Sequence, residues 1–328
     1  MIPINYYLGV TQLNYFISEI DDSGNVYSID NLVLEYVLNH PNTKYIDFLH
    51  SLKLKYPEYE KEYYENLNKP YSSKWQFYNN NVHLCKGIST WFGKWTVNNS
   101  GDKICFPIVK IEFNPNKHGN KPILNDLMDF IDENCGDSEL KKYDFAIDFK
   151  CKPEDIIYST RKEKGLHKGT RYYGQRNKDG YCKIYNKRVE QNLDYDLTRI
   201  EFTLVHKKQG KNHKKDLNID DIFKRSGCSD ENIKLSKPML ALYRLCALCD
   251  ISNLDYREII DDLNKREKYM ILGALSSSKF EEYKFDVNIH DRLIDKVYQK
   301  YHINKLHMPD EEDENGFMKV SDYDIPFD

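Results

Sequence analysis

Four short segments between Lys141 and Val205 alternate between apolar and polar residues, and this alternation constrains the fold more than any other feature of the chain. Their sequences are YDFAIDF (143–149), KGTRYYGQR (168–176), GYCKIYNKRVE (180–190) and TRIEFTLV (198–205). A period of two is that of a β-strand, because successive side chains point to opposite faces of a sheet. The segments therefore predict strands with one apolar face and one face that carries carboxylates, cations and tyrosines.

The polar face of these predicted strands has two interpretations. One is the solvated face of an antiparallel sheet, which often carries mixed charge. The other is a divalent metal site beside a tyrosine nucleophile. Carboxylates that share a surface repel each other unless a cation neutralises them. A tyrosine phenol near such a cation ionises more easily and can attack phosphorus.

Carboxylates on the polar faces are the candidate metal ligands. Asp144 and Asp148 lie four residues apart on one strand, so their Cα atoms are about 13 Å apart. We therefore expect one to bind the ion and the other to position DNA or a cation. Oxygen-only ligands favour Mg²⁺ or Mn²⁺ over zinc. The full candidate set is Glu112, Asp144, Asp148 and Glu201.

Positive charge is concentrated in the same region. The whole chain has a formal net charge of −4, but residues 141–215 carry 20 Lys/Arg and 10 Asp/Glu, which leaves −14 for the rest. Such a basic block indicates a local phosphate-binding surface, although ordinary surface variation is the alternative. The run HKKQGKNHKK (206–215) is either a flexible loop that contacts the DNA backbone or a solvated linker. The candidate DNA-binding residues are Arg176, Lys183, Arg188, Lys207, Lys208, Lys214 and Lys215.

Four motifs together resemble the Rep_trans family, the replication initiation factors of rolling-circle plasmids and phages, with related relaxases of conjugative elements. In order they are KIEFNPNK (110–117), YDFAIDF, KIYNKRVE and TRIEFTL, within residues 108–205. The resemblance implies a metal-dependent, HUH-like endonuclease that nicks and rejoins origin DNA through a tyrosine bound to the 5′ phosphate. It also implies a homodimer and a nick site exposed in a hairpin or single strand. The chain departs from the usual HUH pattern, because no His-x-His lies on any of these strands.

Tyr185, in the KIYNK segment, is the nucleophile that the resemblance implies. Lys183 and Lys187 flank it, where they would lower its pKa and hold the scissile phosphate. Arg199 would clamp the phosphate or pair with Glu201. Because the chain has 26 tyrosines, residue type alone selects none of them. The rival nucleophiles are Tyr172, Tyr173 and Tyr181.

The order of elements predicts an α+β fold. A strand at 104–114 and a helix at 122–133 precede three further strands, an order that suggests a ferredoxin-like, HUH-like antiparallel sheet. We expect a nicking domain at 1–215, with its core at 104–205 and a flanking part at 1–103. Within that flank, apolar spacing predicts a helix at Asp30–Asn39. Residues 216–308 are predicted to be helical, as a winged-helix-like DNA-binding region or as a cover for the sheet.

The last twenty residues are acidic. Residues 309–328 carry eight Asp/Glu against one Lys, which is typical of a disordered tail. The tail ends DYDIPFD, similar to the acidic tip of bacterial single-stranded-DNA-binding proteins, although here Asp328 follows the phenylalanine. This likeness makes Ile325, Pro326 and Phe327 candidates for binding a helicase or another replisome protein. A short solvating tail is the alternative.

Composition narrows the class of protein. Hydrophobic residues make up 40% and charged residues 30% of the chain, and no apolar run approaches the ~20 residues of a membrane span. The N-terminus lacks a secretory pattern and the eight cysteines are irregularly spaced, so we expect reduced thiols and a cytoplasmic location. Two functions compete with a rolling-circle replication initiator. One is a conjugative relaxase, and the other is a non-catalytic DNA- or RNA-binding regulator on a ferredoxin-like fold.

Overall fold

The computed structural model describes residues 17–39, 43–65, 71–78, 87–97, 101, 103–158, 163–167, 169–205, 222–226, 235–252, 254–276 and 278–303. Within these ranges, no helix is both long and apolar enough to cross a membrane. Two sets of candidate residues lie outside the described ranges: the DNA-binding lysines of 206–215 (Lys207, Lys208, Lys214 and Lys215) and the partner-binding residues of the tail tip (Ile325, Pro326 and Phe327).

Contacts divide the chain into two compact units, and each interleaves distant parts of the sequence. Unit 1 comprises Met1–Ala146, Thr203–His213 and Asn288–Asp328; unit 2 comprises Ile147–Phe202 and Lys214–Val287. This division differs from the contiguous ranges 1–215 and 216–308 expected from the sequence. Two strands change unit along their length, because the boundaries after Ala146 and after Phe202 fall inside them.

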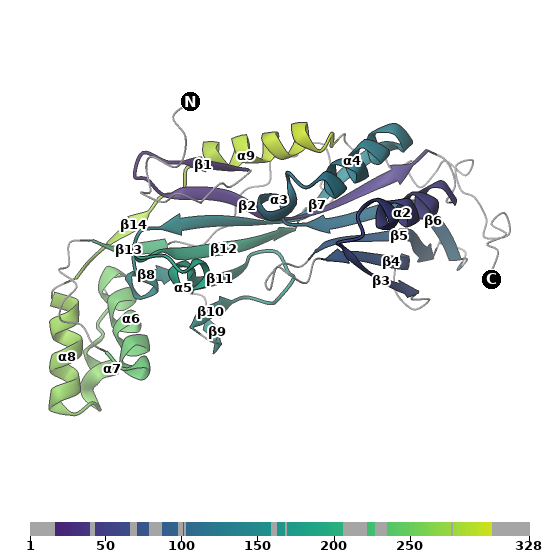
Figure 1. The fold of residues 1–328 in the computed structure, drawn as a ribbon. Helices are drawn as coiled ribbons and strands as arrows, with labels where there is room; N and C mark the ends of the chain where they lie inside the picture. Colours follow the sequence, from purple (N-terminus) through teal and green to yellow (C-terminus); the bar gives the residue numbers. More distant parts are fainter. Residues whose placement is uncertain are drawn as a thin grey trace. The chain divides into compact units, whose positions relative to one another are not determined.

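Unit 1 is built on a large antiparallel sheet (Figure 1). Its strands follow the order β3-β4-β5-β6-β2-β7, with β1 paired to β2. Every pairing among β1 to β6 in this order is antiparallel. Their bounds are β1 Ser18–Ile20, β2 Val26–Leu38, β3 Glu60–Glu65, β4 Tyr71–Tyr78, β5 Ile88–Val97, β6 Lys103–Phe113 and β7 Cys135–Phe149.

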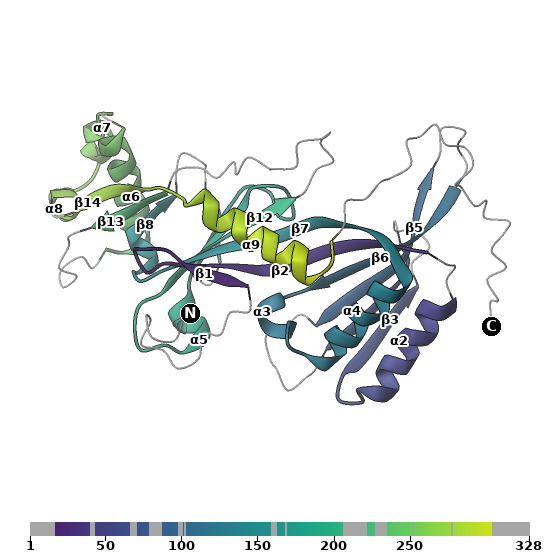
Figure 2. The ribbon, with the colours of Figure 1, turned by 90° about the horizontal axis from the view of Figure 1, so that it is seen from above.

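Helices of unit 1 cover one face of its sheet. They are α2 Thr43–Lys55, α3 Pro115–His118, α4 Pro122–Asn134 and α9 Val287–Lys300, and Figure 2 shows α2 beside α4. Tyr45 of α2 packs against Phe92 of β5 and Phe130 of α4, with ring centroids 5.8 and 5.6 Å apart. His290 of α9 packs edge-on against Phe145 of β7, with its centroid 5.2 Å away. The predicted apolar faces of 104–114 and 122–133 are therefore in the core, as expected.

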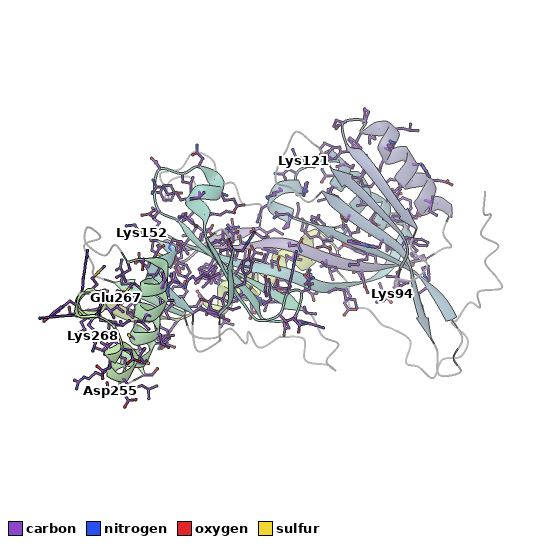
Figure 3. The ribbon with its side chains drawn as sticks, turned by 90° about the horizontal axis from the view of Figure 1, so that it is seen from below. Lys94, Lys121, Lys152, Asp255, Glu267 and Lys268 are labelled. Atoms are coloured by element: carbon purple, nitrogen blue, oxygen red, sulfur yellow. The ribbon has the colours of Figure 1, made fainter. Side chains whose placement is uncertain are left out.

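The other face of this sheet carries charge. Glu35 is 5% exposed, and its Oε2 lies 3.2 Å from the Nζ atoms of both Lys94 and Lys141. Figure 3, seen from below, labels Lys94 on β5. The ammonium of Lys110 lies 4.0 Å from the ring centroid of Trp91 on the neighbouring strand. Oppositely charged side chains thus neutralise a carboxylate that the sheet largely buries.

The helix predicted at Asp30–Asn39 is wrong, because all of this segment except Asn39 lies within strand β2. Nearly every residue of β2 is buried, on both faces of the strand. With both faces buried, the alternation disappears and the apolar positions imitate helical spacing. Pairing with β6, where Leu34 lies opposite Ile111, outweighs the local pattern.

Unit 2 carries part of the large sheet, a small separate sheet and a helical group. The strands of the large sheet in this unit follow the order β12-β11-β10-β9, and the separate sheet has the order β14-β13-β8. Tyr158 of β8 packs on Tyr173 and Phe202 of the first sheet, with centroids 5.0 and 5.7 Å apart, which joins the two apolar faces. The strands are β8 Ile156–Tyr158, β9 Glu163–His167, β10 Thr170–Tyr173, β11 Tyr181–Asn186, β12 Thr198–Val205, β13 Ile222–Ser226 and β14 Lys279–Tyr283.

The helical group of unit 2 has its own small core. Met239, Cys246, Ile260 and Ile271 are buried together between its helices. Asp255, Glu267 and Lys268, labelled in Figure 3, belong to the same group. Its helices are α6 Lys237–Ile251, α7 Arg257–Asp261 and α8 Lys265–Ser276. Among the described residues of 216–308, helices are present as predicted, but Ile222–Ser226 and Lys279–Tyr283 form strands β13 and β14. The winged-helix assignment stays a prediction.

The class of fold is therefore mixed α+β with a large antiparallel sheet, as the alternation predicts. The ferredoxin-like and HUH-like arrangement stays a prediction.

Candidate functional site

The β10–β11 hairpin positions the tyrosines of the candidate site. Its loop turns through Gly174 and Gly180, whose φ angles of +77° and +72° favour glycine. The loop sets an antiparallel register in which Tyr172 lies opposite Lys183. Because side chains alternate, Tyr172, Tyr181, Lys183 and Tyr185 share one face of the hairpin.

The opposite face of the hairpin is core. Ile184 is fully buried, as its place in the pattern predicts. Arg171 is only 2% exposed, and its guanidinium donates to the carbonyl oxygens of Pro153 and Ile156 at 2.6 and 3.1 Å. This buried arginine ties the hairpin to the turn before β8. It could not be predicted from the sequence, because its partners are backbone atoms of another segment.

On the polar face, Tyr185, Glu201 and Lys183 form one cluster. The Tyr185 hydroxyl donates to Glu201 Oε2 at 3.4 Å, which is long for a hydrogen bond between oxygens. The Lys183 ammonium contacts Glu201 Oε1, and Glu201 as a whole is 7% exposed. A nearly buried carboxylate thus stands between a cation and the predicted nucleophile. This geometry permits proton transfer from the phenol to the carboxylate.

Lys187 reaches the same cluster from a helix, where the sequence predicts a strand. Strand β11 ends at Asn186, whose side chain accepts a hydrogen bond from the Val189 amide and caps helix α5, Lys187–Gln191. The Lys187 ammonium lies 2.8 Å from Glu190 Oε2 and 5.6 Å from the ring centroid of Tyr185. It flanks Tyr185 as expected, but by way of a capped helical turn.

Asp148 and Arg199 engage each other. Arg199 Nε and Nη2 each lie 2.6 Å from a different oxygen of Asp148, and both side chains are 1% exposed. This is a bidentate ion pair between β7 and β12 within unit 2. Of the two roles predicted for Arg199, the structure shows ion pairing, but with Asp148 rather than with Glu201.

The remaining predicted metal ligands belong to unit 1. Asp144 accepts a hydrogen bond from the Thr203 hydroxyl at 2.7 Å. Glu112 accepts from the Asn31 amide at 3.3 Å and lies 4.0 Å from the Lys142 ammonium. Among the described residues, no three His, Cys, Asp or Glu side chains are grouped so that they could hold a metal ion. As arranged here, Asp148 and Glu201 are neutralised by Arg199 and Lys183, so they do not fit a preformed Mg²⁺ or Mn²⁺ site.

Two predicted DNA-binding arginines lie at the surface of unit 2. Arg176 is exposed in the β10–β11 loop. Arg188 is exposed on α5, where its Nη1 lies 3.0 Å from Asp196 Oδ1 and its Nε donates to the Leu193 carbonyl at 3.2 Å. Arg176 is therefore placed beside the tyrosine face, whereas Arg188 also closes the loop before β12.

The rival tyrosines have other surroundings. Tyr173 is buried on the apolar face of the hairpin, against Tyr158. Burial raises the pKa of Tyr181 above its ordinary value, although Lys183 and Arg176 act in the opposite direction. Tyr172 and Tyr181 stack on each other, with centroids 6.3 Å apart and an interplanar angle of 18°. The sequence missed this pair, because the hairpin register that brings the rings together depends on the turn.

Comparisons with known proteins add little. No family model matches the chain, and no curated protein matches it. Among solved structures, the chain is similar to a rolling circle replication initiator protein from Geobacillus stearothermophilus, with 13% identity over 77% of this chain and 96% of that chain. The TM-score is 0.31. A likeness of this size carries no argument about the fold or the function, so both rest on the residues described above.

Proposed function

We propose that this chain is a DNA nicking and joining enzyme that acts as a rolling-circle replication initiator, with Tyr185 as its nucleophile. The observation that carries the proposal is the Tyr185–Glu201 contact at 3.4 Å, with Lys183 on the same carboxylate and Lys187 beside the ring. A phenol, a base and two cations are the groups that attack on a phosphodiester requires.

The step is a transfer of the phosphoryl group to tyrosine. The Tyr185 oxygen forms a bond to phosphorus, the bond from phosphorus to the 3′ oxygen breaks, and the phenolic proton passes to Glu201. The departing 3′ oxygen takes a proton from water, and the reverse reaction rejoins the strand. An ordinary phenol has a pKa of about 10 and an ordinary carboxyl about 4, so the lysines must stabilise the phenolate for this transfer to occur.

A divalent cation stays a proposal from the sequence. Such an ion would supply charge stabilisation at the reacting phosphate, and no step above depends on it. The proposed substrate is origin DNA with its nick site in a hairpin or single strand. A homodimer, and recruitment of a replisome protein by the tail, likewise stay proposals.

The test is a covalent-adduct assay. The full chain is mixed with labelled single-stranded oligonucleotides from its own replicon, with Mn²⁺, Mg²⁺ or EDTA, and the products are separated on a denaturing gel. We expect an adduct that disappears in Tyr185→Phe and persists in Tyr181→Phe, which removes a matched hydroxyl from the same strand. Loss of the adduct in EDTA would support the cation.

Other outcomes separate the alternatives. An adduct that survives Tyr185→Phe keeps the enzyme class and moves the nucleophile to another tyrosine. Cleavage of a transfer origin in preference to a replication origin would favour a relaxase. Tight DNA binding without cleavage of any origin would favour a non-catalytic regulator, in which the ion pairs of this face are structural.

A further inference from the structure

The stacked tyrosines beside the nucleophile have no role in the chemistry above. Tyr172 and Tyr181 lie on the same face of the hairpin as Tyr185. On β11, Lys183 lies between Tyr181 and Tyr185. Each of these positions is about 6.7 Å from the next, because two residues of a strand span that distance. An aromatic pair, a cation and the proposed nucleophile therefore lie in one row within unit 2.

Tyr172 is the more accessible ring of the stacked pair. On strand β9, the residue opposite Tyr172 is Gly165, which has no side chain. Tyr172 itself is half-buried, whereas Tyr181 is 8% exposed. A glycine within a strand often marks a place where a ligand or another backbone approaches closely. Tyr181 thus supports the ring of Tyr172, and the residue opposite Tyr172 on β9 is a glycine.

Two cations, Lys183 and Arg176, act on this pair. Burial, the largest influence, raises the pKa of Tyr181, while the charges of Lys183 and Arg176 lower it, so both cations act at the Tyr181 hydroxyl. Arg176 is exposed at the hairpin loop, and Lys178 of the same loop is also exposed. Aromatic rings with flanking cations are the elements of a single-stranded nucleic acid site, in which bases stack and the cations follow the phosphates.

We propose that Tyr172, supported by Tyr181, is a stacking platform for one unpaired nucleobase next to the phosphate that Tyr185 attacks. The ring of a tyrosine on a sheet face accepts the flat side of a base, which only an unstacked base presents. The inference rests on the proposed function of this site and deepens it, because it assigns single-stranded DNA as the form of substrate bound here.

The test measures binding without cleavage. Full-length Tyr185→Phe protein is titrated into a fluorescent single-stranded oligonucleotide from the replicon, and anisotropy gives the Kd. Tyr172→Ala should weaken binding about tenfold, within the range reported for loss of one stacked base. Tyr172→Phe should bind as the parent does. Gly165→Leu should also weaken binding, because a side chain at the position opposite Tyr172 would compete with the base for that ring while both rings remain.

Two controls exclude a general effect. Tyr269→Ala removes a tyrosine that is 66% exposed on α8, and it should leave the Kd unchanged. An abasic nucleotide is then moved along the oligonucleotide. At the position where the base stacks on Tyr172, the abasic nucleotide should weaken binding by the parent about tenfold. It should hardly change binding by the Tyr172→Ala variant, because both changes remove the same interaction.

Three outcomes would overturn the inference: no binding of single strands by the parent, an unchanged Kd in Tyr172→Ala, or equal abasic losses in both proteins. Its failure is separable from that of the proposed function. If the Tyr172→Ala variant binds with the parental Kd, and the chain with Tyr185 intact and Tyr172→Ala still forms the adduct, only the platform is refuted. If binding depends on Tyr172 but the unmodified chain forms no adduct, only the nuclease is refuted.

Discussion

At the scale of single residues, each charged side chain near Tyr185 has a partner of opposite charge. Lys183 contacts Glu201, Lys187 contacts Glu190, and Arg199 holds Asp148. Charges removed from water need such partners, because desolvation costs several kcal/mol per ion. The Lys183 side chain is 29% exposed, so it can exchange Glu201 for a phosphate, whereas Arg199 at 1% cannot reach one without unfolding its surroundings. We therefore expect Arg199 to act as a positioning residue.

The Asp148–Arg199 pair gives a stability prediction. Asp148→Asn leaves the guanidinium of Arg199 buried without its counter-charge, and we expect the free energy of unfolding to fall by about 3–5 kcal/mol. Urea denaturation followed by circular dichroism measures this change. In the double variant Asp148→Leu/Arg199→Met, apolar packing replaces the ion pair and should restore most of the lost free energy of unfolding. A loss below about 1 kcal/mol in the single variant would mean that water reaches the pair.

The residues of the candidate site could be predicted from the sequence better than their partners could. Alternation correctly placed Tyr185, Lys183 and Glu201 on one face, because the period of a strand fixes the face of each residue. Alternation could not show that Arg199 would form its ion pair with Asp148 rather than with Glu201. That choice depends on which strands are neighbours and in what register, and on the geometry of a forked guanidinium.

At the scale of elements, prediction succeeded where one face of an element is buried and failed where both are. Helix α4 and strand β6 show clear apolar periods and lie where the sequence predicts. Strand β2 is buried on both faces and carried no such period. Helix α5 interrupts a segment with strand alternation, because the Asn186 cap and Lys-Arg-Val-Glu-Gln stabilise one helical turn there.

The attachment of α9 to β1 gives a prediction of pH dependence. Glu19 of β1 accepts from Arg292 at 2.8 Å and from Lys296 at 2.6 Å, both on α9. Burial raises the pKa of Glu19, but the two cations outweigh it and hold the pKa below the ordinary 4.5. A lowered pKa means that the folded state binds this proton less tightly than the unfolded state does. The stabilisation is therefore present above pH 4.5 and is lost as the pH falls through the folded value.

Glu19→Gln tests this sign. At pH 7 and low salt, we expect the variant to be less stable than the parent by up to about 1 kcal/mol per ion pair. The difference should shrink toward zero as the pH falls through the lowered pKa of folded Glu19, because below it Glu19 is protonated in both states of the parent. Urea titrations of both proteins at each pH measure the difference in their free energies of unfolding. Other groups that titrate in acid contribute equally to both proteins, so their effect cancels in this difference. A difference that stays constant with pH would show that the contact acts through packing.

At the scale of the whole molecule, the distribution of charge matters more than its sum. A chain of net charge −4 should be repelled by DNA, yet residues 141–215 carry an excess of ten positive charges. At physiological ionic strength, interactions between exposed charges are screened beyond about 8 Å. A DNA strand bound on the tyrosine face would therefore interact electrostatically mainly with nearby cations, such as Arg176 and Lys178. Affinity should then depend on these few side chains and decrease steeply with salt.

The salt dependence of binding tests this locality. For single-stranded DNA, the slope of log K against log salt is about −0.7 for each phosphate contact, because each contact releases counterions. Replacing Arg176 and Lys178 with glutamine should reduce the steepness of the slope by about 1.4, which corresponds to two contacts. Replacing two exposed lysines of α2, Lys44 and Lys53, changes the net charge equally and should leave the slope unaltered. Equal slopes for both double variants and the parent would place the DNA elsewhere, whereas equal reductions would show that total charge, and not the hairpin loop, governs binding.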